Sequence, residues 1–321
     1  PLSLIYAAAV YLRNLSYDLG WRSSSTFNTP TICVGNLSLG GTGKTPMIEW
    51  LIRNISNYQR IAVLSRGYRR KTVGFVLADS QSTAEDIGDE PLQIYSKFPS
   101  VTMVSDGNRR RGISVLENQF DPELILLDDA FQHRKVIPRY SILLTTFNRL
   151  YTEDWFLPTG NLRDSKSQAK RANLIVVTKC PGDLSDESMA DIRSRLKPKA
   201  HQEVLFCTIE YSALIQGRAG SRQLDELKSS AVTVATGIAD PDPFLKFLSQ
   251  QGIELNHIKF RDHHHFSASD LDLLRKEPLV LTTEKDYVRG LNVLDQAYFL
   301  EVRHRFLSDG KQQLLNALKN L

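Results

Sequence analysis

The chain has 321 residues, 41% of them hydrophobic and 24% charged, which is typical of a globular protein of about two domains. Its 40 basic and 36 acidic residues leave a formal net charge of +4, which argues against general nucleic-acid binding. Three scattered cysteines, Cys33, Cys180 and Cys207, lack metal-ligand spacing and are typical of buried thiols in a reducing compartment. Nothing in the sequence indicates an obligate protein partner.

The first predicted element is an apolar helix at residues 1–22. Its first twelve residues carry no charge, and their large aliphatic side chains are Leu2, Leu4, Ile5, Val10 and Leu12. This run is too short to span a bilayer. Arg13 and Arg22 follow it, whereas a signal peptide has its basic residues before the apolar core. Two interpretations remain: a membrane-associating helix at the bilayer surface, or a terminal helix packed on the protein's own core.

A glycine-rich loop follows the apolar segment at residues 31–34 and precedes a predicted helix at 46–55. It reads Gly40-Gly41-Thr42-Gly43-Lys44-Thr45. In this setting backbone N–H groups can surround a phosphate chain, Lys44 can reach the β- and γ-phosphates, and the Thr45 hydroxyl can bind Mg²⁺. Ser38 and Leu39 replace residues that related phosphate loops have as Gly and Lys. We predict nucleotide binding here; the alternative is a glycine-rich turn with a chance Lys-Thr pair.

Short apolar runs alternate with helical patterns up to about residue 210. The predicted strands are residues 31–34, 60–65, 75–77, 101–104, 124–127, 141–145, 174–177 and 204–209. This alternation predicts an α/β fold like that of P-loop NTPases, with a mostly parallel sheet and flanking helices. Ligands of such sheets bind beyond the carboxyl ends of the strands. The site should therefore form from the loops that follow residues 34, 65 and 127.

An acidic segment begins the helix predicted after residue 87. It reads Gly88-Asp89-Glu90-Pro91. Asp is a good helix cap and Pro is favoured in the first helical turn, so capping is the simplest role for Asp89. A carboxylate in this place can also accept a proton from a hydroxyl nucleophile. The segment by itself leaves both roles open.

A second acidic pair, Asp128-Asp129, ends the predicted strand at 124–127. Phosphate-loop proteins use such a carboxylate to hold Mg²⁺ opposite the loop hydroxyl, so Thr45 and Asp128 are the predicted metal ligands. The alternative is an acidic turn after a buried strand. The residues that follow, 131–134, either line a substrate pocket or begin the next helix.

Arginines cluster at residues 66–71, 108–111 and 162–163. Such clusters are usually solvated, but the first follows a predicted strand at the edge of the site, and Arg is suited to binding phosphate through two hydrogen bonds. Guanine-specific proteins use an Asn/Thr-Lys-x-Asp run, and the nearest segment, 178–181, lacks the Asp. The nucleotide is therefore predicted to be ATP.

Residues 212–228 are polar and predict a linker between a first domain at 23–211 and a smaller α/β domain at 229–321. The second domain should contain strands near 232–236 and 280–283, helices at 243–250 and 268–276, and a final helix from Gly310. Three consecutive histidines stand at 263–265. If extended, His263 and His265 share a face and could bind a metal, although no other ligand cluster supports this. The alternative is a single His that domain closure brings to a carboxylate of the first domain.

Six segments occur together in an informative order. They are residues 35–46, Ser65-Arg66-Gly67-Tyr68, Gly88-Asp89-Glu90-Pro91, Asp128-Asp129-Ala130-Phe131-Gln132-His133, Leu157-Pro158-Thr159-Gly160-Asn161-Leu162-Arg163 and Phe260-Arg261-Asp262-His263-His264. Jointly they resemble the tetraacyldisaccharide 4'-kinase family of lipid A biosynthesis, from the N-terminus to about Asp286. Ala130 stands where that family most often has Gly.

The resemblance implies phosphorylation of the 4'-hydroxyl of a tetraacyldisaccharide 1-phosphate, dependent on ATP and Mg²⁺. It implies a peripheral enzyme at the cytoplasmic face of the bacterial inner membrane, with two α/β domains that close over the nucleotide. It further implies that Lys44 and Thr45 bind the triphosphate and metal, that Asp128 belongs to the metal shell, and that Asp89 paired with His263 activates the hydroxyl. The positions that the family uses for the disaccharide and its phosphate are Tyr68, Arg109, His133 and Arg163.

Two other classes of protein fit part of the sequence. A nucleotide-switched assembly or metal-insertion factor would share the glycine-rich loop, but Leu39 and the Asp89/His263 pair argue against it. A membrane-associated scaffold with a degenerate nucleotide site is disfavoured because Lys44, Thr45 and Asp128 are all present.

Overall fold

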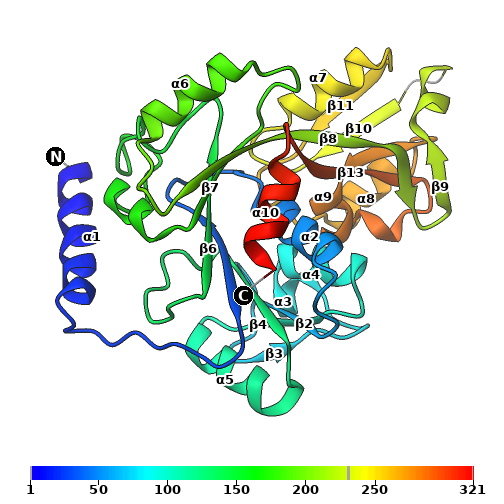
Figure 1. Cartoon of the computed structure of the whole chain (residues 1–321). Helices are drawn as coiled ribbons and strands as arrows, with labels where there is room; N and C mark the ends of the chain where they lie inside the picture. The colour runs from blue at the N-terminus through cyan, green and yellow to red at the C-terminus, as the bar shows by residue number, and fades with distance from the viewer. Residues whose placement is uncertain (1, 230–231, 320) are drawn as a thin grey trace. The chain divides into compact units, whose positions relative to one another are not determined.

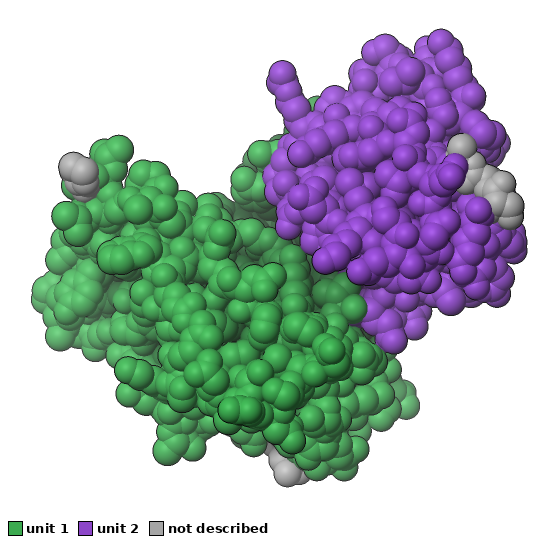
Figure 2. All heavy atoms as spheres, turned by 90° about the horizontal axis from the view of Figure 1, so that it is seen from above, with its two compact units in different colours: residues 1–80, 86–209, 304–321 green, residues 81–85, 210–303 purple. Residues whose placement is uncertain are grey.

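The chain forms two compact units, which are coloured separately in Figure 2. The computed structural model describes residues 2–229, 232–319 and 321. Unit 1 contains Pro1–Ser80, Asp86–Ile209 and His304–Leu321, and unit 2 contains Gln81–Glu85 and Glu210–Arg303. Apart from the short segment Gln81–Glu85, the chain leaves unit 1 within strand β8 (Glu203–Gly217) and returns within strand β13 (Ala297–Phe306).

Unit 1 is built on a mostly parallel sheet (Figure 1). Besides β8, its strands are β1 (Thr31–Asn36), β2 (Ile61–Ser65), β3 (Val76–Leu77), β4 (Thr102–Ser105), β5 (Leu124–Asp128), β6 (Tyr140–Thr146) and β7 (Leu174–Thr178). They lie in the order β8-β7-β6-β1-β5-β2-β4-β3, in which each strand is parallel to the next except for the antiparallel pair of β4 and β3. Thr31 pairs with Ile125 and Ile32 with Tyr140, which places β1 between β5 and β6.

Helices cover both faces of this sheet, and its central strands are buried along almost their whole length. The helices of this part of the chain are α1 (Leu2–Asp18), α2 (Lys44–Asn54), α3 (Ala84–Ile87), α4 (Asp89–Lys97), α5 (Arg109–Phe120), the 3₁₀ helix η1 (Lys166–Arg171), α6 (Asp186–Leu196) and α10 (Gly310–Leu318). Alternate residues of one strand enter different cores: Cys33 packs with α5 and α6, whereas Val34 packs with α2, α4 and α10. Burial on both faces explains the continuous apolar runs in the sequence.

Unit 2 has a smaller parallel sheet. Its strands are β10 (Val232–Thr236), β11 (Leu255–Lys259), β12 (Val280–Thr283) and the first part of β13, in the order β11-β10-β12-β13. Its helices are α7 (Asp242–Gln250), α8 (Ala268–Leu274), α9 (Glu284–Arg289) and the 3₁₀ helices η2 (Leu224–Ser229) and η3 (Leu291–Val293). Their apolar side chains form two small cores around Val234 and Ala235.

The eight strands that the sequence predicts in the first part of the chain are all present. The structure differs at residues 212–228, where a linker is predicted: they contain the end of β8, the antiparallel strand β9 (Gly220–Gln223) and η2. The hairpin is exposed along β9, which explains its polar sequence. The final helix also differs, because the predicted second domain includes it, whereas Leu314 and Leu318 of α10 pack in the core of unit 1.

The N-terminal helix α1 contacts the rest of unit 1 along one side only. Asn14 is buried and donates to Asp164 Oδ1 at 2.7 Å, and the Tyr6 hydroxyl donates to the Arg163 carbonyl at 3.1 Å. Leu4 and Ile5 remain 75% and 67% exposed. The contacts therefore fix one side of the helix and leave apolar side chains uncovered. Among the described residues, no helix has the length and apolar character needed to cross a membrane.

Candidate active site

The glycine-rich loop connects β1 to α2, and Lys44 is the first residue of that helix. Gly40 and Gly43 have φ angles of 108° and 86°, in the left-handed region that glycine adopts without a steric penalty. The first N–H groups of a helix have no partner within it and attract anions. The loop therefore has the backbone needed to bind phosphate.

Side chains from the ends of neighbouring strands hold this loop. Asn36 Nδ2 donates to Thr42 Oγ1 at 2.9 Å, and the Thr178 hydroxyl donates to the Thr42 carbonyl at 2.9 Å. On the other side, Leu39 N donates to the Asn161 carbonyl at 2.7 Å. The loop is thus fixed by β1, β7 and the segment that precedes Arg163.

Asp128 is the last residue of β5, which is paired with β1, and it is almost completely buried. Ser65 at the end of β2 donates its hydroxyl to Asp128 Oδ2 at 2.9 Å. The other oxygen, Oδ1, is buried and has no hydrogen-bond partner among the described residues. Burial, with the negative charges of Asp129 and Glu90, raises the pKa of Asp128 to about 6. A positive charge beside Oδ1 would offset the free-energy cost of burying the ionised carboxylate.

Asp129 has a different environment. Lys44 Nζ lies 3.9 Å from its Oδ1, and Arg163 donates from Nη1 to Oδ2 at 3.0 Å and also contacts Oδ1 through Nη2. Burial by itself would raise the pKa of Asp129, but Lys44 and Arg163 outweigh it and the pKa is lowered. Asp129 therefore stays ionised and orients both cations.

The two predicted metal ligands suit Mg²⁺. Asp128 offers the unpartnered carboxylate oxygen, and Thr45 is a buried hydroxyl in the first turn of α2. In the part of the chain that the structure describes, no group of three or more His, Cys, Asp or Glu side chains forms a metal site. Mg²⁺ in phosphoryl-transfer sites usually takes one or two carboxylates and completes its shell with phosphate and water. The donors present fit that requirement.

Asp89 is the first residue of α4, and Gly88 occupies the capping position with a φ of 100°. A Cβ at Gly88 would lie 3.0 Å from Gly67 Cα, so the helix start packs closely on the loop after β2. Asp89 is therefore not the N-cap that the simplest interpretation of the sequence predicts. Its neighbour Glu90 contributes to the raised pKa of Asp128, which places the start of α4 beside the carboxylates.

Arg109 and His133 lie around the same centre. Arg109 is 3% exposed, and it donates from Nη1 to the Asp106 carbonyl and from Nη2 to the Asp128 carbonyl, both at 3.4 Å. Burial, followed by the positive charge of Arg109, lowers the pKa of His133 to about 4, so its ring is neutral at pH 7. Arg109 Nε and His133 Nε2 are buried and have no hydrogen-bond partner among the described residues.

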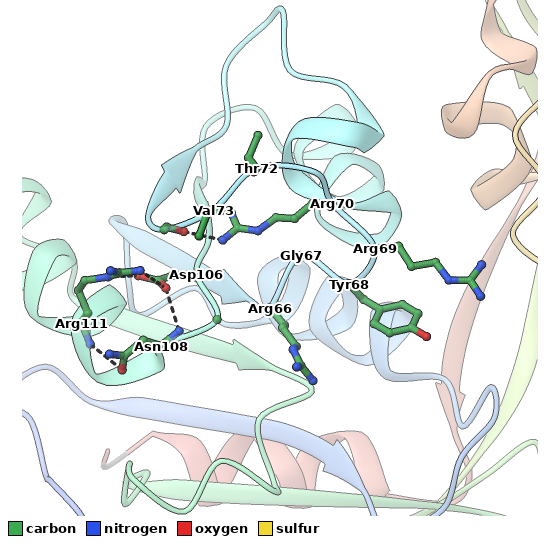
Figure 3. Close-up of a pocket in the computed structure, with 12 residues that line it drawn as sticks. Arg66, Gly67, Tyr68, Arg69, Arg70, Thr72, Val73, Asp106, Asn108 and Arg111 are labelled. Atoms are coloured by element: carbon green, nitrogen blue, oxygen red, sulfur yellow. Dashed lines mark hydrogen bonds and ion pairs between the residues drawn. The ribbon is translucent and has the colours of Figure 1, made fainter.

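A cavity of about 490 Å³ adjoins this centre and is lined by residues 66–70, 72–74, 106–108 and 111. Arg111 forms two hydrogen bonds of 2.8 Å with Asp106, and Arg70 donates to the Ser105 carbonyl at 2.8 Å. In Figure 3, Arg66 and Tyr68 extend from the same loop away from Asp106. Tyr68 is 54% exposed, so the predicted substrate residue is accessible.

His263 lies in unit 2, in a turn rather than in the extended segment that would align it with His265. Its φ is 59°, and its N–H donates to the Gly237 carbonyl at 2.9 Å. Gly237 is held by a buried ion pair: its N–H donates to Asp286 at 2.9 Å, and its carbonyl accepts from Arg289 at 3.1 Å. The pairing of His263 with Asp89 stays a prediction, because the two residues belong to different units.

Four residues of the site have no role predicted from the sequence: Asn36, Ser65, Thr178 and His304. The first three end apolar strands, and polar residues in such places are a usable signal, since strand ends line the site of a parallel sheet. His304 donates to the Gly43 carbonyl from β13, a strand that the sequence analysis does not predict. The structure also shows that residues 131–134, which the sequence predicts either to line a pocket or to begin a helix, form turns and do not begin a helix.

Lys44 at the start of a helix and a buried carboxylate at the end of the adjacent parallel strand form the arrangement by which P-loop proteins bind a nucleoside triphosphate. Fold and site together place the chain in the class of P-loop nucleotide-binding proteins.

Comparisons with known proteins narrow this class. The model of the tetraacyldisaccharide-1-P 4'-kinase family (LpxK) matches residues 1–320. The tetraacyldisaccharide 4'-kinase of Flavobacterium johnsoniae is 47% identical over 314 residues, covering 96% of this chain and 92% of that protein. The enzyme of the same name from Flavobacterium psychrophilum is 44% identical, with 97% and 93% covered.

A solved structure agrees with the sequence comparisons. The crystal structure of the "apo" form of LpxK from Aquifex aeolicus in complex with ATP is 28% identical, has a TM-score of 0.80, and is matched over 99% of this chain and 96% of that one. This chain belongs to the tetraacyldisaccharide 4'-kinase family. It is accordingly an ATP-dependent phosphotransferase of lipid A biosynthesis with an alcohol acceptor, which confirms the resemblance and the α/β fold found in the sequence.

Proposed function

We propose that the enzyme transfers the γ-phosphoryl group of ATP, bound by residues 40–45, to the 4'-hydroxyl of a tetraacyldisaccharide 1-phosphate. The observation that carries the proposal is Asp128 Oδ1, a buried carboxylate oxygen without a described partner at the end of the strand beside the loop. The family description and the names of the Flavobacterium relatives support the acceptor.

Thr45 and Asp128 are the residues that we assign to Mg²⁺. The bound ion would neutralise charge on the β- and γ-phosphoryl oxygens. Lys44, 3.9 Å from Asp129 in the structure, would exchange part of this contact for the phosphates when ATP binds. Arg163 keeps Asp129 in place through its two contacts, so that the carboxylate remains a fixed partner for Lys44.

Asp89 is the proposed proton acceptor for the 4'-hydroxyl, oriented by His263. Two facts support Asp89: it is 9% exposed at the start of α4, and the adjacent Glu90 is close enough to affect the pKa of Asp128. The support for His263 is its fixed backbone, which the Asp286–Arg289 pair holds through Gly237. A base that acts only in the transition state raises kcat without improving ATP binding.

The four proposed acceptor-binding residues differ in exposure. Tyr68 is exposed at the cavity beside Arg66, where it can contact the disaccharide. Arg109 and His133 have buried nitrogens without described partners, which suit the oxygens of a sugar or phosphate. Arg163 is already bonded to Asp129, so its proposed contact with the acceptor uses the remaining donors of its guanidinium.

The membrane is the proposed site of action. A substrate with four acyl chains stays in the bilayer, so the enzyme must bind the bilayer surface to reach it. Helix α1 supports this because Leu2, Leu4, Ile5, Tyr11 and Leu12 are all more than half exposed. We therefore place the protein peripherally on the cytoplasmic face of the inner membrane.

The test is transfer of radiolabel from γ-labelled ATP to detergent-solubilised tetraacyldisaccharide 1-phosphate by the wild type, Asp89→Asn and Asp186→Asn. Asp186 is an exposed acid in the first turn of α6 and controls for the loss of charge at a helix start. We expect labelled lipid from the wild type and the control, and a loss in kcat of about 100-fold or more for Asp89→Asn at unchanged ATP affinity.

Two outcomes would contradict the proposal. Near-normal turnover by Asp89→Asn would remove the assigned base. ATP hydrolysis by the wild type with unlabelled lipid would point instead to a nucleotide-switched protein without a small-molecule acceptor.

A further inference from the structure

A histidine from the far end of the chain contacts the phosphate loop. His304 lies in β13, at the residue where the chain re-enters unit 1, and it is 4% exposed. Its Nε2 lies 2.8 Å from the carbonyl oxygen of Gly43, the left-handed residue directly before Lys44. No step of the proposed mechanism uses this ring.

The Gly43 carbonyl is the first acceptor of α2. It accepts a hydrogen bond of 3.1 Å from Met47 N, the first bond of the helix, and the bond from His304 uses its second lone pair. The ring also fills the space beside Gly43 Cα: a Cβ at this position would lie 2.6 Å from His304 Nε2 and 2.7 Å from Cε1. The turn is therefore held both by a hydrogen bond and by packing.

The atoms around the His304 ring determine which of its two nitrogens carries the proton. Burial lowers the pKa of His304 to about 4, although the backbones of Gly43 and Thr208 oppose the shift, so the ring is neutral at pH 7. To donate to Gly43, a neutral ring must carry its proton on Nε2. Nδ1 is then an acceptor, and it lies 3.3 Å from Cys207 Sγ, a buried thiol whose raised pKa keeps it protonated.

Cys207 and His304 belong to the two strands by which the chain passes between its units. Cys207 lies in β8, three residues before the chain enters unit 2, and His304 lies in β13, where it returns. Leu307 N donates to the Phe206 carbonyl at 2.9 Å and joins the same two segments within unit 1. The contact at Gly43 thus connects the phosphate loop to both crossing strands.

We propose that His304 is a positioning residue for ATP: its Nε2–H holds the Gly43 carbonyl in the orientation that keeps the phosphate loop and the start of α2 ready to bind the triphosphate. The inference rests on the proposed nucleotide-binding role of residues 40–45, and it is independent of the roles of Asp89 and of the lipid acceptor. By reciprocity, bound ATP stabilises the same contact and with it the junction of β8 and β13.

The test compares His304→Gln, which retains an N–H donor, with His304→Phe, which retains a ring but cannot donate. The affinity for a non-hydrolysable ATP analogue is measured by calorimetry, and KM is measured separately for ATP and for lipid. We expect His304→Phe to raise the Kd of the analogue and the KM for ATP by about five- to tenfold, which corresponds to the loss of one hydrogen bond. The KM for lipid should stay unchanged. In His304→Gln the Kd of the analogue and the KM for ATP should stay within about twofold of the wild-type values.

Leu300→Ala is the matched control. Leu300 is buried in the same strand but in the core of unit 2, so its truncation destabilises the protein without touching the phosphate loop. It should lower the melting temperature and leave the analogue Kd unchanged. If His304→Phe does not fold, His304→Leu removes the donor with a smaller side chain.

Hydrogen exchange gives a readout that a merely structural role would not change. The analogue should slow exchange of the amides of residues 300–307 in the wild type and in His304→Gln, and this nucleotide-dependent part should be lost in the non-donating variant.

An analogue Kd for the folded Phe or Leu variant equal to that of the wild type would overturn the proposal. So would equal losses in the Gln and Phe variants, because the retained donor would then have no effect. A wild type that binds the analogue but never labels lipid would refute the proposed function while leaving the His304 comparison intact.

Discussion

At the scale of single residues, the site of unit 1 contains two adjacent carboxyl groups whose pKa values are shifted in opposite directions. Burial raises the pKa of Asp128 to about 6, whereas Lys44 and Arg163 outweigh burial at Asp129 and lower its pKa. Two adjacent carboxylates therefore have different electrostatic environments. Asp128 has an oxygen available for a cation, and Asp129 is already committed to two protein cations.

The neutral ring of His304 predicts a dependence of stability on pH. Its pKa is about 4 in the folded protein and 6.5 for a free side chain, so the unfolded chain binds the proton more readily. Stability from this residue is fully present above about pH 6.5 and is lost as the pH falls toward 4. The difference of 2.5 pKa units corresponds to about 3 kcal/mol in the free energy of unfolding.

We expect His304→Gln to lose less stability than the wild type between pH 7 and pH 4.5, by about 2 to 3 kcal/mol. Urea unfolding at the two pH values measures this difference, and comparing the two proteins cancels the titration of His133 and the carboxylates. Parallel pH profiles of the two proteins would show that the ring is not held neutral.

At the scale of secondary structure, α1 leaves apolar side chains exposed and β13 passes between the two units. Helix α1 is held through polar contacts at Tyr6 and Asn14 while its apolar residues remain exposed. Strand β13 is not among the predicted strands, although its apolar residues alternate with Glu301, Arg303 and Arg305, a pattern that favours a strand. Burial follows this alternation only in the last part of β13, where His304 and Phe306 are buried and Arg303 and Arg305 are exposed. Earlier in the strand Glu301 is buried, and the strand then passes from unit 2 to unit 1.

The exposed apolar face of α1 predicts binding to a bilayer surface. We expect the double variant Leu4→Asn/Ile5→Asn to lower partitioning onto vesicles of zwitterionic and anionic phospholipid by at least about tenfold, because two apolar side chains no longer enter the interface. Sedimentation with vesicles measures the partitioning. Leu273→Asn, a change at a 46% exposed leucine in unit 2, is the control. Equal sedimentation of all three proteins would favour a helix that only packs on the core.

At the scale of the whole molecule, the chain folds into two units with separate cores. Unit 1 contains the phosphate loop and the carboxylates, and unit 2 contains His263. Each unit fixes its own residues through contacts within that unit. In unit 2 this task falls to the Asp286–Arg289 pair, whose side chains are 0% and 1% exposed.

Removing one member of that pair should loosen unit 2. We expect Asp286→Ala to destabilise this unit by about 3–5 kcal/mol, because it leaves the Arg289 charge buried and unpaired. Hydrogen exchange should become faster in residues 232–303 and stay unchanged in β1 and β5. Asp272→Ala breaks an exposed ion pair with Arg275 and should change stability by less than about 1 kcal/mol. Equal acceleration in both units would show that they unfold together.

Six segments of the sequence jointly identify the family. The sequence also predicts the eight strands of the first part of the chain, the phosphate loop and the acidic strand end. These features are local: each is encoded by fewer than about twenty consecutive residues, through hydrophobic period and backbone preference. Asp128 could be assigned in this way because a strand end and its polar residue are adjacent in the sequence.

The folded structure alone shows which distant residues meet. Arg163 is 127 positions from the Asn36 that it contacts, and His304 is 261 positions from Gly43. It likewise showed that Gly88, not Asp89, caps α4, and that residues 212–228 include strands. Such contacts depend on the register and order of the strands, which no single segment encodes, because they result from burying all the apolar faces of the chain at once.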